Sequence, residues 1–143
     1  MAVHLIWSTA GREPYIAAEW KDRLYSFIGG VLQNKHAKLL CAGGMSDHIH
    51  LYISLPSTIT LAETVNVIKA NSSRWIHQNF PKLSTFAWQS GYGAFSVSKS
   101  SESRLIEYIK NQESHHRGRS FQEEYLEFLV RFSIEYDERY LWG

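Results

Sequence analysis

The stretch GGMSDHIHLYISLP, residues 43–56, constrains the fold more than any other part of the sequence. Glycine, serine and aspartate give a turn signal between two apolar runs, so residues 36–55 are predicted to form two strands joined around residues 43–47. Pro56 ends the second strand. Because alternate side chains of a strand share a face, His48 and His50 are expected to project from the same side of the sheet.

Patterns typical of strands and helices alternate along the rest of the chain. The first predicted helix begins at Pro14 and is loosened at Gly29 and Gly30, and the second is capped by threonines and ends before Pro81. The predicted elements are a strand at 3–9, a helix at 14–35, the two strands within 36–55, a helix at 58–80, a strand–turn–strand segment at 86–100, helices at 101–118 (with Gly118 as its stop) and 120–132, and a tail with strand propensity at 136–142.

This order of elements predicts an α+β fold. We expect a ferredoxin-like or RRM-like antiparallel sheet with helices packed on one face, followed by a C-terminal helix that carries Tyr108. A chain of 143 residues has the size of one domain, so residues 1–143 are predicted to form a single one.

Composition narrows the classes of protein that this chain can represent. The single cysteine, Cys41, excludes an internal disulfide and a site built from paired thiolates, and fits a reducing compartment. The sequence has no apolar run long enough to span a bilayer and no signal-peptide pattern at its start, so we expect a cytoplasmic protein without a membrane partner. Between Glu63 and Glu102 there are four basic residues and no acidic ones, so this segment is suited to contact phosphates, whereas acidic residues dominate after Ser120.

Two imidazoles on one strand face can ligate one divalent ion, but they leave most of its coordination sphere open. The same pattern also arises from histidines that are exposed or hydrogen-bonded for structural reasons. A second constellation is YIKNQ, in which Tyr108 and Gln112 lie four residues apart and share a helix face. Alone, this pair is equally typical of a half-buried tyrosine beside a polar residue.

Together the two constellations suggest chemistry on phosphate. Two neutral histidines and the neutral oxygen of Gln112 would leave the charge of a divalent ion uncompensated, and such an ion attracts phosphate. It would act as a Lewis acid on a phosphodiester while Tyr108 attacks the phosphorus and becomes a covalent carrier.

At the level of motifs, the chain resembles the single-tyrosine HUH transposases of the insertion sequence 200/605 family, including their REP-associated domesticated relatives. His48-Ile49-His50 matches the His-hydrophobic-His motif, and YIKNQ resembles the tyrosine helix. Ser46 stands where many relatives have proline, which affects a turn. The blocks that resemble the family, in the same order, are GGMSDHIHL, KANSSRWIH, FAWQSGYGAFSVS, YIKNQESHH and IEYDERYLW.

The resemblance implies that His48, His50 and Gln112 bind Mg²⁺ or Mn²⁺ and that Tyr108 is the nucleophile. It further implies cleavage and rejoining of single-stranded DNA near hairpins through a 5′-phosphotyrosine intermediate, by a homodimer whose subunits share active sites. No nucleotide fuel is needed for this chemistry, and the sequence has no P-loop motif.

Contacts with DNA are expected from cations and small donors without nearby acids, and from aromatic rings such as Trp88 or Tyr92 on which unpaired bases stack. Asp47 is expected either to orient a histidine or to form the turn, and His115 and His116 either contact DNA or end a helix. The candidate DNA-binding residues are Lys69, Asn71, Ser73, Arg74, Arg117 and Arg119.

The sequence leaves three other interpretations open. A histidine-triad or metal phosphohydrolase would want a third alternating histidine, but position 52 is a tyrosine. A non-catalytic module that binds RNA or single-stranded DNA on a similar sheet would need neither the histidine pair nor Tyr108. A domesticated nuclease that cleaves chromosomal hairpins would keep the same chemistry in a different biological role.

Overall fold

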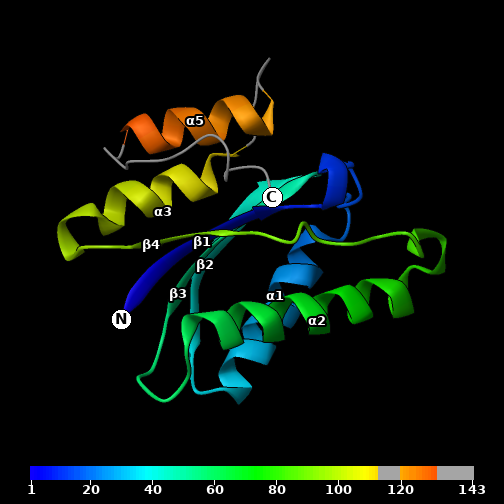
Figure 1. The fold of residues 1–143 in the computed structure, drawn as a ribbon, viewed down its shortest axis with the longest axis horizontal. Helices are drawn as coiled ribbons and strands as arrows, with labels where there is room; N and C mark the ends of the chain where they lie inside the picture. Colours follow the sequence, from blue (N-terminus) through cyan, green and yellow to red (C-terminus); the bar gives the residue numbers. More distant parts are fainter. Residues whose placement is uncertain (113–119, 132–143) are drawn as a thin grey trace.

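The computed structural model describes residues 1–112 and 120–131, arranged around a four-stranded antiparallel sheet (Figure 1). The strand order is β2-β3-β1-β4, which is the ferredoxin-like order, so the predicted fold class is confirmed. The elements are β1 (Ala2–Ser8), α1 (Lys21–Asn34), β2 (Lys38–Met45), β3 (His48–Ser54), α2 (Leu61–Asn79), β4 (Gly93–Ser96), α3 (Glu102–Lys110) and α5 (Phe121–Arg131), with short 3-10 turns at Ala10–Arg12, Pro81–Leu83 and Lys99–Ser101.

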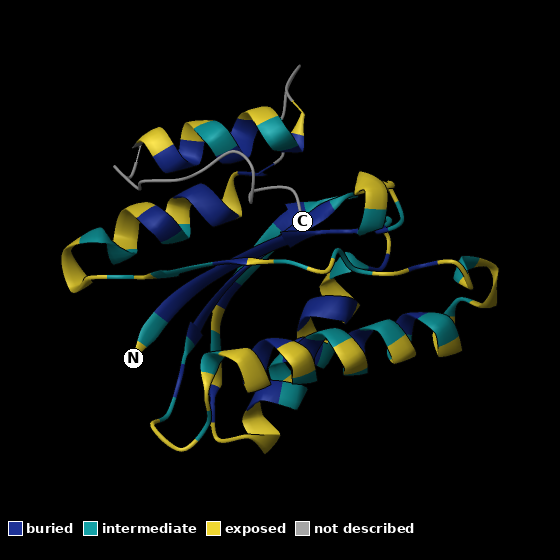
Figure 2. Ribbon diagram, viewed as in Figure 1, coloured by how far each residue is buried: buried dark blue, intermediate teal, exposed yellow. Residues whose placement is uncertain are grey.

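Helices cover both faces of this sheet. Figure 1 shows α1 and α2 on one side and α3 and α5 on the other, and Figure 2 shows that the buried stripes of these helices face the strands. In β1 and β3 the odd-numbered residues pack with α1 and α2, while Ile6 and Tyr52 pack with α3 and α5. His48 and His50 therefore lie on the face that α3 and α5 cover. The tyrosine-bearing helix is α3.

Two predicted elements are shorter in the structure than in the prediction. α1 begins at Lys21, because the backbone N–H of Ile16 donates to the carbonyl of Ser46 (2.9 Å) and holds the preceding segment against the β2–β3 turn. The helix then runs unbroken through Gly29 and Gly30, so the predicted loosening is wrong. Of the predicted strand–turn–strand segment at 86–100, only β4 and one isolated bridge between Thr9 and Trp88 form.

The predicted cap of α2 is confirmed. The backbone N–H of Glu63 donates to the side chain of Thr60 (3.1 Å), and the helix ends before Pro81. The predicted stop at Gly118 and the strand-like tail at 136–142 lie outside the described residues. Within 1–112 and 120–131, no helix has the length and apolar character needed to cross a membrane.

Candidate metal and tyrosine site

The two histidines project together from the middle of the sheet. β3 pairs with β1 and β2 on its two sides, and this position buries both imidazole rings completely. Their ring centroids are 5.2 Å apart, with the planes nearly perpendicular at 77°. The shared face predicted from the alternation of the strand is therefore the face on which α3 and α5 pack.

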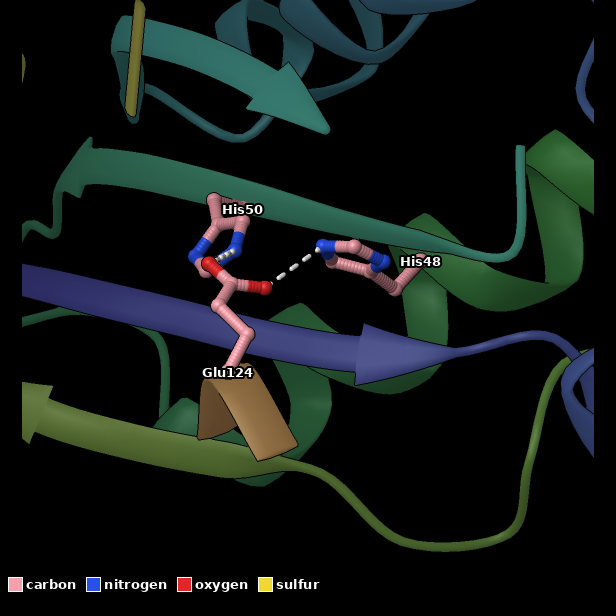
Figure 3. Close-up of side chains that lie close together, drawn as sticks. All are labelled: His48, His50 and Glu124. Atoms are coloured by element: carbon pink, nitrogen blue, oxygen red, sulfur yellow. Dashed lines mark ion pairs between the residues drawn. The ribbon is translucent and has the colours of Figure 1, made fainter. Parts of the chain in front are cut away.

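A carboxylate that the sequence reasoning missed completes this pair. Glu124 on α5 extends its carboxylate to the two rings, with Oε2 3.2 Å from His48 Nε2 and Oε1 3.5 Å from His50 Nε2 (Figure 3). One ligand atom from each of the three side chains lies within 4.8 Å of the others, a spacing that can hold one metal ion. A signal existed in the sequence, because Glu124 falls within the buried stripe that Phe121, Tyr125 and Phe128 form along α5.

Tyr108, on α3, and Gln112, just after it, reach His48, His50 and Glu124 and complete a buried group of five side chains, called the cluster below. The hydroxyl of Tyr108 donates a hydrogen bond to Glu124 Oε1, and its ring lies 5.5 Å from that of His50. Gln112 Oε1 lies 3.1 Å from His48 Nε2. The four residues predicted to carry the chemistry thus meet within one chain, and all of them are buried.

Each histidine also has a partner on its far nitrogen. His48 Nδ1 lies 2.8 Å from Asp47 Oδ1, the orienting contact considered for Asp47 in the sequence. His50 Nδ1 lies 3.0 Å from Nε2 of His4, a buried residue of β1 that sequence reasoning did not single out. The far nitrogens are therefore held by groups outside the cluster, and both Nε2 atoms face Glu124.

The electrostatics of the two histidines differ. Burial by itself lowers the pKa of His48, but the hydrogen bonds and charges of Asp47 and Glu124 outweigh burial and raise that pKa to about 9. Burial and the neighbouring His50 hold the pKa of His4 well below its ordinary value, so His4 is neutral. The cluster without metal therefore holds one proton on His48 that a bound cation would displace.

α3 is docked closely on the sheet at two places. A Cβ added at Gly43 of β2 would overlap the carbonyl oxygen of Ile109, so the helix backbone lies directly on this glycine. At the other end of α3, the hydroxyl of Tyr52 donates to Glu102 (2.5 Å), and burial together with this carboxylate raises the pKa of Tyr52 to about 12. These contacts fix where Tyr108 lies.

The predicted DNA contacts on α2 lie on the opposite side of the sheet from the cluster. Lys69 Nζ donates to the carbonyl oxygens of Gln89 and Gly91, each at 2.8 Å, and lies 5.3 Å from the ring of Trp7. This ammonium group thus ties a loop to the helix, and burial lowers its pKa to about 8. Of the other candidates on α2, Asn71 donates to the carbonyl of Val67, Ser73 is partly buried and Arg74 is exposed.

Arg117 and Arg119, together with His115 and His116, lie outside the described residues. A polar hollow of about 500 Å³ lies beside the cluster, between the start of α1, the end of β2 and the end of α3. Gln112 lines this hollow, and so do the cations Lys21 and Lys110.

Sequence comparison places the chain among transposases. The family model described as "Transposase IS200 like" matches residues 1–112. The ISDra2 transposase TnpA of Deinococcus radiodurans is 24% identical over 114 residues, which cover 76% of this chain and 81% of that protein. The transposase for insertion sequence element IS200 of Salmonella typhimurium is 23% identical over 114 residues, covering 76% of this chain and 74% of that protein.

Two solved structures share the fold of this chain. A protein of Deinococcus radiodurans R1 superposes with a TM-score of 0.65 at 25% identity, covering 78% of this chain and 90% of that one. A REP-associated tyrosine transposase bound to a REP hairpin has a TM-score of 0.62 at 14% identity, covering 80% of this chain and 67% of that one, and so shares the fold. The match to the family model ends at Gln112, so it does not include Glu124.

Proposed function

Because the chain belongs to the IS200-like transposase family, we propose that it cleaves and rejoins single-stranded DNA with Tyr108 as its nucleophile. The observation that carries this proposal is the buried cluster itself. It brings the hydroxyl of Tyr108 into a hydrogen bond with a carboxylate that also contacts both histidines. A packed sheet that only bound nucleic acid would have no need for such an arrangement.

We assign a divalent metal, Mg²⁺ or Mn²⁺, to His48, His50 and Glu124, with the amide oxygen of Gln112 as a further ligand. Carboxylate and amide oxygens suit both ions, two imidazole nitrogens suit the transition-metal ion Mn²⁺ better than Mg²⁺, and the spacing of the three ionisable side chains fits one ion. When bound, the ion would polarise the phosphodiester as a Lewis acid. From the sequence, two neutral histidines and a neutral glutamine would leave the charge of the metal ion uncompensated. The carboxylate of Glu124 would neutralise part of that charge.

The hydrogen bond between Tyr108 and Glu124 supports a route for the proton. A phenol has a pKa near 10 and attacks poorly while protonated. In our mechanism Glu124 takes this proton as the phenol oxygen bonds to phosphorus, and the bond from phosphorus to the 3′ oxygen breaks. Glu124 then gives the proton to the 3′ oxygen, which leaves as a hydroxyl. The 5′ phosphate stays on Tyr108, so the bond energy is kept for the reverse step, in which another 3′-hydroxyl attacks.

DNA would approach through the polar hollow beside Gln112. Its cations, Lys21 and Lys110, suit the phosphates on either side of the cleaved bond, whereas the side chains of the cluster are closed to solvent. The relative bound to a REP hairpin supports hairpin-flanked DNA as the substrate. A domesticated nuclease that cleaves chromosomal hairpins remains the second candidate for the same chemistry.

The experiment that tests the nucleophile uses labelled single-stranded hairpin DNA with candidate flanks, incubated with Mn²⁺ or with chelator and run on a denaturing gel. We expect a covalent band of protein and DNA that needs metal and is absent from Tyr108→Phe and His48→Ala. Tyr15→Phe is the matched control, because the Tyr15 hydroxyl contacts the exposed Thr85 at 3.1 and 3.4 Å, on the other side of the sheet from the cluster. A band that survives in Tyr108→Phe would refute the assignment, and metal-dependent cleavage without any adduct would indicate a hydrolase.

A mixture of inactive variants tests whether the tyrosine acts within its own chain. The predicted homodimer with shared active sites stays a prediction, but the contacts of Tyr108 within one chain support action in cis. Mixing His48→Ala with Tyr108→Phe should therefore give no adduct. If the mixture recovers a substantial part of the wild-type band, one subunit supplies the tyrosine to the other, and the cis assignment is wrong.

A further inference from the structure

His4 lies against the histidine pair but outside the residues assigned to the metal. It comes from β1, where it is 1% exposed, and its ring lies nearly parallel to that of His50, with centroids 5.2 Å apart and an angle of 17° between the planes. The ring of Phe128 on α5 also packs against the His4 ring, with centroids 4.9 Å apart. This packing holds the imidazole in one orientation.

The contact between the two rings fixes where their hydrogens lie. His4 Nε2 and His50 Nδ1 are 3.0 Å apart, so one of the two nitrogens must donate and the other accept. The opposite nitrogen of His50 faces Glu124, where a metal would take its lone pair. A neutral imidazole that gives Nε2 to a metal carries its hydrogen on Nδ1, so His50 donates to His4, and His4 carries its own hydrogen on Nδ1.

Packing alone does not account for a histidine at this position. Nδ1 of His4 is buried and has no hydrogen-bond partner among the described residues. An unpaired buried N–H costs free energy that a phenylalanine ring would avoid, and the surroundings of His4 include the apolar rings of Phe95 and Phe128. What only the histidine supplies here is the acceptor Nε2.

We propose that His4 is a positioning residue, which accepts the hydrogen bond from His50 and so holds its ring with Nε2 presented to the metal. Asp47 plays the same part for His48, through the 2.8 Å contact to Nδ1. The proposal rests on the metal site assigned above. Partners on the far nitrogen of a ligating histidine fix both its tautomer and the direction of its ring.

Mn²⁺ binding, followed by the paramagnetic resonance signal of the free ion, tests the proposal without requiring DNA cleavage. His4→Phe keeps an aromatic ring but removes the acceptor, and we expect it to weaken Mn²⁺ binding by roughly 10–100-fold. His4→Gln places an amide oxygen near the position of Nε2 and should restore most of the affinity. The matched control is His77→Phe, because His77 bonds to the carbonyl of Phe86 in the other core, away from the cluster.

Nitrogen-15 NMR of the imidazole rings in the wild-type protein gives a second readout that does not depend on any variant folding. With Mg²⁺ bound, His50 and His4 should both appear as the Nδ1–H tautomer. Three results would refute the role of His4 and leave the metal site in place. They are wild-type Mn²⁺ affinity in His4→Phe, equal losses of affinity in His4→Phe and His4→Gln, and the Nε2–H tautomer for His50. Failure of the wild-type protein to bind Mn²⁺ would overturn the metal site as well.

Discussion

Gly43→Ala tests whether the docking of α3 on β2 sets the position of Tyr108. A Cβ at this position would lie 3.0 Å from Ile109 Cγ2 and closer still to the Ile109 carbonyl oxygen. Carbon atoms pack best at about 3.5–4.0 Å, so α3 must retreat by roughly 0.5 Å or more. Overpacking of this kind costs about 1–3 kcal/mol, and a displacement of about 1 Å at a reacting group can cost about 100-fold in rate.

We therefore expect Gly43→Ala to lower the free energy of unfolding in urea by about 1–3 kcal/mol and to slow adduct formation about 10–100-fold. Gly30→Ala is the matched control, since nothing lies within 4 Å of its added Cβ and Gly30 is inside α1. That change should stabilise the protein by about 0.5–1 kcal/mol and leave adduct formation unchanged. If Gly43→Ala is as stable and as fast as the wild type, the close approach of the helix does not set the site.

Three further outcomes follow from the contacts of the buried face and the core. The pKa of His48, raised from 6.5 to about 9, means that the folded metal-free protein holds this proton more tightly than the unfolded chain. Its contribution to the free energy of unfolding, up to about 3 kcal/mol, should be complete below pH 6.5 and lost as the pH rises to about 9. Urea unfolding at a series of pH values measures this loss, and the reasoning is contradicted if the free energy of unfolding of His48→Gln falls with pH as steeply as that of the wild type. Tyr52→Phe removes the 2.5 Å hydrogen bond to Glu102 and should lower the free energy of unfolding by about 1–2 kcal/mol, so an unchanged urea midpoint would argue against a role in docking. Ser72→Ala leaves the indole N–H of Trp88 without its 2.9 Å acceptor and should cost about 1–3 kcal/mol, whereas an unchanged thermal midpoint would show that the N–H finds another partner.

Local patterns predicted the parts of the fold that depend on neighbours in sequence. The alternation of β3 placed His48 and His50 on one face, because that relation needs only the geometry of a strand. The Thr60 cap of α2 was equally local. The start of α1 depends instead on a contact between residues distant in sequence. Pro14 is a good first helical residue, but the hydrogen bond between Ile16 and Ser46 keeps the residues after Pro14 out of the helix.

Glu124 and His4 show what local patterns could not supply. The pairing of β1 with β3 sets Ile6 opposite His50, and this register brings the same-face residue His4 beside His50. Nothing near position 4 indicates it. Glu124 falls within an apolar helical stripe, which signals a buried carboxylate but does not identify its partners. Its partners depend on how α5 packs over the sheet, which the sequence did not reveal.

The two histidines are alike in sequence but not in the environments that the fold gives them. His48 has an acid on its far nitrogen, which strengthens its hold on a proton and, once metal displaces that proton, its donation to the metal. His50 has a neutral histidine there, which fixes its direction without adding charge. A single carboxylate, Glu124, then faces both Nε2 atoms and Tyr108. The His-x-His motif thus supplies two nitrogens, but their orientation and charge depend on residues 46 positions upstream and 74 positions downstream of His50, brought together by strand pairing and helix packing.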